Sequence, residues 1–506
     1  MLSPQPNRWV VLLVVMLAFL PIVLDLTILH VAIPSLTLAL EATGTEVLWI
    51  IDIYPLLMAS LLIPMGTLAD RIGHRRLLFI GLSVFGVGSA LAAMSPTAQA
   101  LIGARALMAV GAAMVMPCTL AIIRQTFKDD TERATALGIW GAVASAGAAL
   151  GPLAGGALLE HFWWGSVFLV NVPVLMLAIP LVFFLAPRHA VLAEGAWKPA
   201  QALLLMAGLM ATVYAIKTGL KSDGAWWLSL VIGCIGTAML AWFVRIQLRS
   251  THAMLDMSLF SKPAIRMGVV MALVVMGSLA GVELLLAQEL QFVTGRSPLE
   301  AGLFMLPLMA ASAVGGPLAG LILRAVGLRL VATGSLALAT ISIAGLAYSD
   351  FNNAGFGVAV LMVGLGLALG VGLTASSVAI MSSAPEEKAG SAGALEATSY
   401  DLGTGLGIAG FGLVMASSYQ RAIHLPEGIA PEVAAIAARS VGETMLAAQS
   451  VGGPSGQAIA EAGRQAFSTS HSMVLLSAAV LIGLLSIMIF SVFRQQANEH
   501  VGAGTH

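Results

Sequence analysis

One charged turn, Gly66-Thr67-Leu68-Ala69-Asp70-Arg71-Ile72-Gly73-His74-Arg75-Arg76, separates two long apolar runs. Four of its residues recur 254 positions later at the same offsets of 0, 4, 7 and 9: Gly66, Asp70, Gly73 and Arg75 become Gly320, Arg324, Gly327 and Arg329. The glycines and the last arginine are kept, whereas the acid is replaced by a base. The repeat therefore predicts a duplicated membrane protein whose two halves share backbone requirements but differ in charge.

Composition sets the broad class of the protein. Of the 506 residues, 58% are hydrophobic and only 10% are charged, whereas soluble domains carry about 25% charged residues. A polytopic membrane protein follows. The net charge of -1 and the lack of a basic cluster argue against a nucleic-acid partner. Cys118 and Cys234 lie in separate apolar runs, so neither a disulfide framework nor a cysteine metal site is expected.

Counting apolar stretches of about 20 residues predicts fourteen membrane-spanning helices. The first begins near Trp9 and is expected to be retained, because no small-residue cleavage pattern follows it. The repeat offset is longer than six spans need, which favours a six plus two plus six arrangement. We predict an N-terminal six-helix bundle at 1–190, two linker helices at 191–250 and a C-terminal six-helix bundle at 251–506, with a long outer loop at about 419–469 that contains some amphipathic helix.

The distribution of basic residues predicts the orientation, because Lys and Arg concentrate in cytoplasmic loops. Alternate turns are basic if the N-terminus is inside, and those turns contain Arg71, Arg75, Arg76, Arg124, Lys128, Arg245, Arg249, Lys262, Arg266, Arg324 and Arg329. With an even number of spans, both termini are expected in the cytoplasm. Duplicated six-span halves, each built from inverted three-helix repeats, are the plan of major facilitator transporters.

Several motifs resemble the fourteen-helix drug/proton antiporter branch of the major facilitator superfamily, the QacA/SmvA-like pumps for quaternary ammonium compounds and methyl viologen. Gly66 to Arg76 is similar to the superfamily's loop between helices two and three. The pattern G-x8-G-x3-G-P-x2-G-G of helix five is matched by Gly138, Gly147, Gly151, Pro152, Gly155 and Gly156. Leu24 to Pro34 resembles the helix-one signature, and Arg105 with Gly111 and Pro117 resembles the helix-four motif.

The resemblance implies an all-α polytopic membrane protein with the major facilitator fold and 14 transmembrane helices. It implies a monomeric, proton-coupled multidrug efflux antiporter in the lipid bilayer of the bacterial inner membrane. Its expected partners are protons and lipophilic cationic small molecules, and no enzymatic activity, cofactor or metal is expected beyond the proton gradient. None of the six lysines follows a glycine, so the phosphate loop of ATP-driven proteins is missing.

Two groups of residues are candidates for gating. Gly66 and Gly73 are expected to allow close approach of helix ends and a sharp turn, while Asp70 pairs with Arg71, Arg75 or a base on a neighbouring helix. The alternative is that these arginines only fix the orientation in the membrane. On helix five, Gly147, Gly151, Gly155 and Gly156 are expected to form a smooth groove for another helix, and Pro152 permits a bend.

Asp25 is the first candidate for proton coupling, since an acid inside the membrane is costly and is by default functional. Arg105, entering from the opposite side on helix four, should reach a similar depth. The resemblance implies that helices one and four are neighbours. It therefore also implies that Asp25 and Arg105 interact. A permanent buried ion pair is the structural alternative. Glu396 is the second candidate, because a further carboxylate in the cavity suits divalent cations.

Other residues are candidates for substrate binding. Asp52 either recruits cations or faces water, and Glu283 lies deeper on helix nine than Glu289, which we expect at the membrane interface. Trp49 and Tyr54 can hold flat cations through their ring faces, although anchoring at the interface is the commoner role of these residues. Asp25 and Glu396 complete the predicted substrate site.

The preferred hypothesis is export of quaternary ammonium compounds, dyes and methyl viologen, with protons and drug competing for the same acids. An exporter of an endogenous metabolite, peptide or siderophore on the same fold is the alternative. A membrane scaffold or membrane-embedded enzyme is a third reading, but no pattern of nucleophile and base stands out in the sequence.

Overall fold

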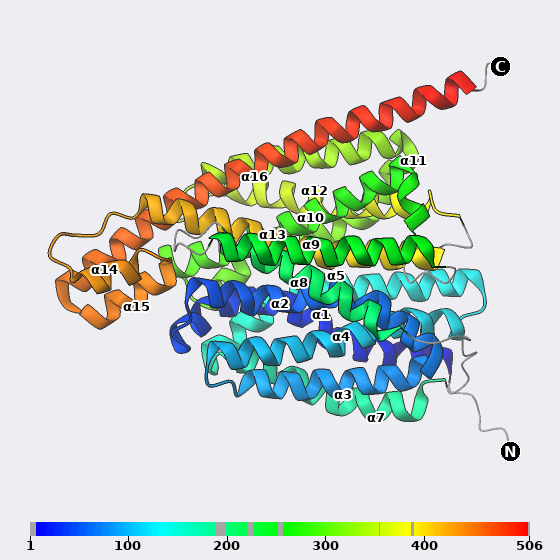
Figure 1. The fold of residues 1–506 in the computed structure, drawn as a ribbon, viewed down its shortest axis with the longest axis horizontal. Coiled ribbons are helices and arrows are strands. Elements are labelled where there is room, and N and C mark those ends of the chain that lie inside the picture. Colours follow the sequence, from blue (N-terminus) through cyan, green and yellow to red (C-terminus); the bar gives the residue numbers. More distant parts are fainter. Residues whose placement is uncertain are drawn as a thin grey trace. The chain divides into compact units, whose positions relative to one another are not determined.

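The computed structural model describes residues 7–187, 198–219, 226–250, 257–353, 355–385 and 389–503. In these ranges the regular secondary structure is entirely helical (Figure 1). The helices are α1 (Arg8–Ala39), α2 (Gly44–Ile72), α3 (His74–Ala93), α4 (Ala98–Thr126), α5 (Asp130–His161), α6 (Ser166–Leu169), α7 (Asn171–Leu185), α8 (Pro199–Gly219), α9 (Trp226–Arg249), η1 (Met257–Ser261), α10 (Pro263–Gln288), η2 (Glu289–Val293), α11 (Pro298–Ala347), α12 (Phe356–Met381), α13 (Ala389–Ala422), α14 (Pro431–Ala437), α15 (Val441–Val451) and α16 (Gly453–Ala503).

Twelve segments in the described part of the chain are long and apolar enough to cross a membrane. One of them is the 50-residue α11, in which Gly327 adopts non-helical angles of φ 79° and ψ 163° and so divides the helix in two. The membrane character predicted from composition is therefore confirmed, as is the all-α fold. The fourteen spans predicted from the sequence are not confirmed by these twelve segments and stay a prediction.

The chain forms two compact units, which are described separately. Unit 1 comprises Met1–Ala32 and Trp49–Leu255, and unit 2 comprises Ile33–Leu48 and Asp256–His506. The last turns of α1 and the first turn of α2 therefore belong to unit 2. The domain boundaries predicted after residues 190 and 250 fall in or beside 188–197 and 251–256, which lie outside the described residues.

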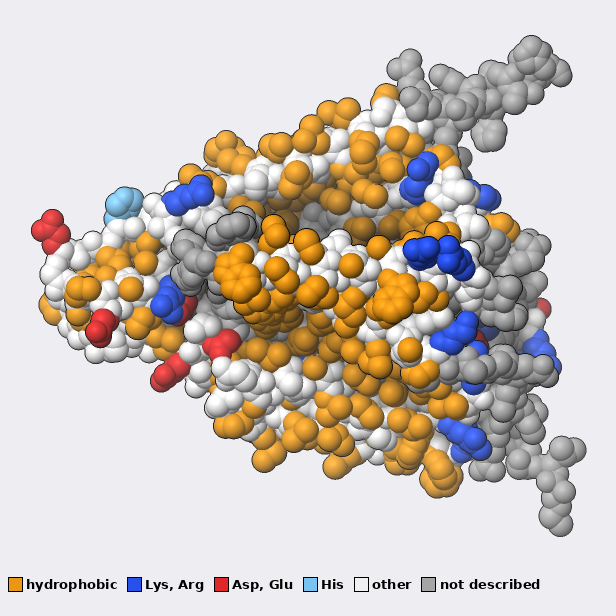
Figure 2. All heavy atoms as spheres, viewed as in Figure 1, with side chains coloured by type: hydrophobic (Ala, Val, Ile, Leu, Met, Phe, Trp, Pro, Cys, Tyr) orange, Lys and Arg blue, Asp and Glu red, His pale blue; other side chains and the backbone are white. Residues whose placement is uncertain are grey.

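In unit 1, small residues bring helix backbones together. A Cβ added to Gly111 of α4 would lie 2.6 Å from the backbone nitrogen of Phe85 in α3, a closeness that only glycine permits. Helices α8 and α9 pack on each other in the same way at Gly236 and Thr212. The outer surface of α9 is covered with hydrophobic side chains, among them Trp227 and Trp242 (Figure 2). Such a surface is suited to lipid rather than water.

In unit 2, α10 and α13 cross at glycines. A Cβ on Gly277 of α10 would lie 2.8 Å from the carbonyl oxygen of Gly403 and 3.1 Å from Cα of Gly407. Helices α11 and α12 approach each other similarly closely, because a Cβ added to Gly315 would lie 2.9 Å from the carbonyl oxygen of Leu367. Exposed apolar residues on α16, including Val480, give unit 2 a surface of its own that is suited to lipid.

The repeated turn has the same backbone conformation in both copies. Gly73, between α2 and α3, has φ 94° and ψ 132°, and Gly327 within α11 has φ 79° and ψ 163°. A positive φ is unfavourable for residues with a Cβ. The first glycine of each copy is different, because a Cβ on Gly66 would lie at an ordinary 3.7 Å from Pro117 and one on Gly320 would touch nothing within 4 Å. The sharp turn predicted at Gly73 is confirmed, whereas close packing does not explain Gly66.

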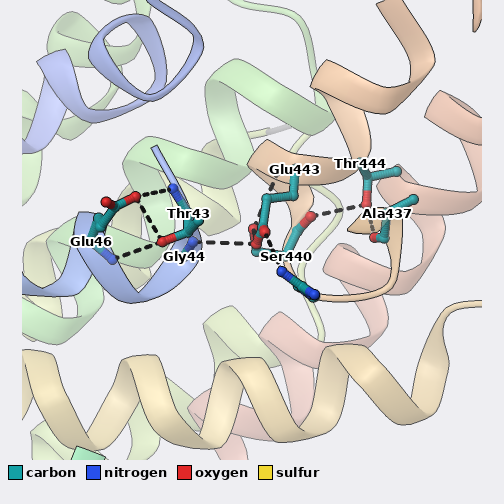
Figure 3. Close-up of polar contacts among 8 residues, drawn as sticks. Thr43, Gly44, Glu46, Ala437, Ser440, Glu443 and Thr444 are labelled. Carbon is teal, nitrogen blue, oxygen red and sulfur yellow. Dashed lines mark hydrogen bonds and ion pairs between the residues drawn. The ribbon is translucent and has the colours of Figure 1, made fainter. Parts of the chain in front are cut away.

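The connection between α13 and α16 is largely helical. Residues 419–422 and 453–469, expected in the outer loop, belong to α13 and α16, and α14 and α15 occupy much of the remainder. Its small core contains Ala437, Ala447, Ala448 and Ile459. The Glu443 carboxylate, at the start of α15, accepts from the Ser440 hydroxyl at 2.9 Å and from the backbone N–H of Gly44 at 3.3 Å (Figure 3). This contact ties α15 to the N-terminus of α2.

Candidate functional site

The first candidate site lies inside unit 1, where α1 and α4 meet. Arg105 Nη1 lies 3.3 Å from Asp25 Oδ2, and the two side chains are 2% and 0% exposed. The interaction predicted between helices one and four is therefore present. Asp25 Oδ1 and Arg105 Nε have no hydrogen-bond partner among the described residues. Because unpaired lone pairs and N–H groups are costly in an apolar interior, the pair retains capacity for a further ligand.

Aromatic rings enclose the Arg105 guanidinium. Its Cζ lies 5.0 Å from the ring centroid of Tyr54 on α2 and 5.8 Å from that of Phe168 on α6. Both distances are within the range of cation–π attraction. These rings stabilise the buried positive charge and fix the direction from which the guanidinium approaches Asp25.

The local sequence explains how each element places its residue. Thr97 caps α4 by accepting from the Ala100 N–H at 3.2 Å, and this defines the register that brings Arg105 two turns into the helix. Helix α1 is almost wholly apolar around Asp25, so that burial of the carboxyl group is enforced by its neighbours. In α1, Phe19 stacks on Trp140 of α5 with ring centroids 4.6 Å apart.

The glycines of α5 form the groove predicted from their spacing, and α1 fills it. Added Cβ atoms would lie 2.8 Å from Val23 Cγ1 at Gly147, 3.0 Å from the Ile28 nitrogen at Gly151, and 2.8 Å from Ile28 Cγ1 at Gly155. The contacted residues flank Asp25 in the sequence. Pro152 and Gly156 are buried in the same helix, whereas the placement of Gly138 lies outside what is described. The motif thus positions the helix that carries the acid.

The remaining candidates of unit 1 are arranged differently from one another. Asp52 is fully buried, so the reading in which it merely faces water is wrong. Tyr54 is also fully buried and lies against Arg105, which excludes its reading as an interface anchor. Trp49 is partly buried, and its ring lies 6.1 Å from that of Tyr214 on α8. Of the predicted residues, the structure therefore brings Asp25, Arg105 and Tyr54 together.

Two acids predicted to bind substrate lie in unit 2. Glu283 of α10 is 3% exposed. Glu396 of α13 is partly buried and accepts a 2.7 Å hydrogen bond from the hydroxyl of Tyr400, one helical turn on. Asp401 is 7% exposed, and its Oδ2 has no hydrogen-bond partner within the described residues. Each is an ionisable group held in the interior of a helical bundle.

At the charged turn, Asp70 pairs with a base that sequence reasoning did not name. Its Oδ1 lies 3.2 Å from His74 Nε2, and the amide of Gln125 on α4 contacts the other ring nitrogen at 3.3 Å. Arg75 instead donates to the carbonyl of Phe183 on α7 and lies 5.3 Å from its ring centroid. Arg71 Nη1 is buried without a hydrogen-bond partner in the described residues. The turn therefore joins α2, α3, α4 and α7.

Sequence reasoning also missed partners that are distant in the chain. Phe168 and Tyr400 were not identified, and Glu289, expected at the interface, is only 2% exposed. Its Oε2 lies 3.1 Å from Nδ1 of His471 on α16. No local motif marks these contacts. The one sequence signal for a functional residue here is an acid within a spanning helix. This signal applies to Glu289 as much as to Glu283.

Apolar spanning helices that carry buried ionisable pairs define a polytopic membrane protein of the transporter class. No group of three or more metal-ligating side chains occurs in the part of the chain that the structure describes. A family model described as "Major Facilitator Superfamily" matches residues 15–408. The chain belongs to this superfamily, and it is a transporter rather than an enzyme.

Individual relatives agree with this assignment. The chain is 47% identical over 491 residues to the methyl viologen resistance protein SmvA of Salmonella typhimurium, covering 97% of this chain and 99% of SmvA. It is 36% identical to the multidrug efflux pump LfrA of Mycolicibacterium smegmatis, covering 97% of each. Among solved structures, a bacterial homologue of the lysosomal transporter Spinster, in an inward-facing conformation, matches with a TM-score of 0.69 and 17% identity, covering 97% and 99% of the two chains. The predicted relationship to the methyl viologen and multidrug efflux pumps is confirmed, and the solved structure supports the fold alone.

Proposed function

We propose that the protein is a proton-coupled multidrug efflux antiporter that exports lipophilic organic cations by alternating access. The substrates are quaternary ammonium compounds, dyes and methyl viologen, and the proton gradient is the energy source, without a bound cofactor. The observation that carries the proposal is the buried contact of Asp25 with Arg105. The names of SmvA and LfrA, a methyl viologen resistance protein and a multidrug efflux pump, support the substrate class.

Asp25 is the proton-coupling acid in this proposal. Arg105 keeps its charge at all physiological pH values, so that Asp25 is the member of the pair that gains and loses a proton. A proton or a cation that reaches Asp25 Oδ1, which has no hydrogen-bond partner among the described residues, competes with Arg105 for the same carboxylate. Drug and proton therefore exclude each other at Asp25, and this exclusion is the requirement for antiport.

The other candidates supply substrate contacts. Asp52 and Glu283 are buried acids, and Glu396 is held by the Tyr400 hydroxyl. Each offers a negative charge to a cation within the bundle interior. Trp49 and Tyr54 offer ring faces for flat cations. Tyr54 already covers the Arg105 guanidinium, so a cation competes with Arg105 for that face.

Gating is assigned to the two glycine-containing motifs. The turn formed by Gly66, Asp70, Arg71, Gly73 and Arg75 links four helices of unit 1 and closes the cytoplasmic side. On α5, Gly147, Gly151, Pro152, Gly155 and Gly156 let α1 slide and tilt, because the contact surface lacks protruding side chains. Movement of α1 relative to α5 then changes the water access of Asp25.

The topology belongs to the same proposal. Counting α11 as two spans at Gly327 and including α5 raises the twelve segments to fourteen, in a six plus two plus six order with α8 and α9 as the linker pair. Both termini are placed in the cytoplasm, the membrane is the bacterial inner membrane, and the functional unit is a monomer.

The test is dye and drug efflux from vesicles with and without a pH gradient. Asp25→Asn is expected to abolish export that depends on the gradient, whereas undiminished export by this variant contradicts the proton-site assignment. Asp25→Asn leaves Arg105 buried without its counter-charge. The free energy of unfolding of this variant is therefore expected to fall by about 3–5 kcal/mol. The double variant Asp25→Asn/Arg105→Gln removes both charges and separates misfolding from loss of coupling.

The panel of substrates also tests the alternative function. Radiolabelled metabolites, peptides and siderophores are offered in the same vesicles as quaternary ammonium compounds and methyl viologen. If only the endogenous compounds drive proton exchange, the multidrug assignment is wrong although the transporter assignment stands. If no compound drives it, both are wrong.

A further inference from the structure

Unit 2 contains a buried acid–base pair that the proposed mechanism does not use. Glu289 is the first residue of η2, and His471 lies on α16. Glu289 Oε2 and His471 Nδ1 are 3.1 Å apart, and each side chain is 3% exposed. A carboxylate and an imidazole placed together in an apolar interior are both able to exchange protons, and ionisable groups at membrane depth often belong to proton relays.

Aromatic rings surround the imidazole. The ring of Phe351 is stacked on that of His471 with centroids 5.5 Å apart and an interplanar angle of 10°, and Phe467 lies 6.2 Å away. His471 Nε2 has no hydrogen-bond partner among the described residues. Within the described residues, the Glu289 carboxylate is therefore the one polar group in contact with the imidazole. The surrounding rings favour states in which the pair has no net charge.

Neighbouring basic groups are engaged elsewhere. Arg464 of α16 donates to the Phe292 carbonyl at 3.4 Å and pairs with Glu461 at 3.4 Å. Arg296 donates to the Phe351 carbonyl at 3.0 Å. Because both arginines contact other groups, the Glu289 carboxylate contacts His471 and neither of these arginines. In the turn that carries Phe351, the Asn352 N–H and the Asn353 amide hold the pKa of Asp350 below its usual value, so this acid stays ionised near neutral pH. The other charged groups described on the helices that pack on η2 or α16 are Arg266 and Glu283 of α10, Glu300, Arg324 and Arg329 of α11, Glu396, Asp401 and Arg421 of α13, and Glu443 of α15.

The backbone under Glu289 is unusual. In η2 the Thr294 N–H donates to the Glu289 carbonyl at 3.1 Å, a bond across five residues, and the Arg296 N–H donates to the Leu290 carbonyl at 2.9 Å. This π-helical turn ends the span begun by α10. Single π turns are rare and occur frequently at functional sites. Here the turn carries the carboxylate that faces α16.

We propose that Glu289 and His471 form a second proton-binding site of the transporter, separate from Asp25. With the proton bound the pair is neutral overall, as a carboxylate and an imidazolium. The proton comes from water and returns to water, leaving a carboxylate and a neutral imidazole. The bound proton holds η2 to α16 through the Glu289–His471 bond, and its release weakens that connection. The assignment to transport rests on the proposed proton antiport.

The first test reads protonation directly and needs no transport. The full-length protein in nanodiscs, with its nine histidines isotope-labelled, is followed by NMR between pH 5.5 and 8.5, and His471→Gln identifies the signal. The expected result is a change in protonation of His471 within this range that Glu289→Gln alters. If His471→Gln does not fold, Glu289→Gln identifies the signal by its displacement. One protonation state of His471 throughout the range overturns the proposal.

The second test counts protons per exported cation in vesicles. Glu289→Gln and His471→Gln are each expected to lower the ratio by one, and the double variant by no more than one. His424→Gln is the matched control, since His424 is exposed and its ring contacts the Ala422 carbonyl. An unchanged ratio with lowered thermal stability shows a purely structural pair and overturns the proposal. If the wild type shows no proton flux, the proposed antiport is wrong, while the NMR test still decides whether the pair binds a proton.

Discussion

The contact between α1 and α5 gives the sharpest test of the site's architecture. In Gly155→Ala the new Cβ would lie 2.8 Å from Ile28 Cγ1 and 3.0 Å from the Ile28 carbonyl oxygen. The carbonyl belongs to the helix backbone, so it does not move aside as the end of a side chain does. Ile28 follows Asp25 by three residues, and α1 must therefore shift near the acid to accept the methyl group.

The size of the effect follows from two opposing terms. Overpacking a well-packed core costs about 1–3 kcal/mol, whereas replacing a glycine inside a helix by alanine gains about 0.5–1 kcal/mol. Gly141→Ala on the same helix is the matched control, because its Cβ meets nothing within 4 Å. We expect the control to be unchanged or slightly more stable, and Gly155→Ala to be about 1–3 kcal/mol less stable than the control.

The assay uses the buried thiol of Cys118 as a reporter of unfolding. Cys118 is buried and Cys234 is exposed, so a Cys234→Ser background leaves one thiol that reacts with a fluorogenic dye upon thermal unfolding. Efflux driven by a pH gradient is measured on the same variants. Gly155→Ala should unfold at a lower temperature and lose most coupled efflux. Equal stability and efflux for Gly155→Ala and Gly141→Ala would refute the inference that α1 needs the glycine groove.

Three further predictions concern other parts of the chain. Gly327→Ala should cost about 1–2 kcal/mol because φ is 79° there, whereas Gly334→Ala, with nothing within 4 Å, should cost nothing; equal thermal midpoints would contradict this. Gly442→Ala places a Cβ 2.7 Å from Thr37 Cγ2, so it should weaken the attachment of α15 and speed proteolysis between α13 and α16. Adding Thr37→Ser removes Cγ2 and should restore resistance to the protease; failure of this rescue argues against the contact. Glu396→Gln should reduce efflux of dications more than of monocations, and equal losses in the vesicle assay count against charge matching.

Sequence reasoning succeeded where the requirement is local. A positive φ at Gly73 and Gly327 depends on a few neighbouring residues, so spacing alone identified both turns. The groove on α5 was also predictable, because glycines four residues apart lie on one face of a helix. The identity of its partner was not contained in the α5 sequence. Only the structure, with its helices packed, identified α1 as the helix that fills the groove beside Asp25.

Contacts between distant parts of the chain account for what was missed. The rings around Arg105 come from α2 and α6, and His471 lies 182 residues from Glu289. Neither pairing leaves a periodic signal. Glu289 was expected at the interface because it lies near the end of an apolar run. In the structure it is buried against α16. Helix α16 begins at Gly453, which is earlier than the apolar part of its sequence indicates.

Charge balance explains why one buried acid is insufficient for a cation exporter. While Asp25 is ionised, Asp25 and Arg105 together carry no net charge, and Arg105 does not lose its proton. A cation that enters this pair therefore adds a positive charge to an apolar interior, which is unfavourable without another carboxylate. Asp52 is the other fully buried acid recorded in unit 1. Removing the charge of Asp52 should accordingly reduce cation binding even where Asp25 and Arg105 are intact, whereas Glu289 and His471, which balance each other, add a proton without adding a cation site.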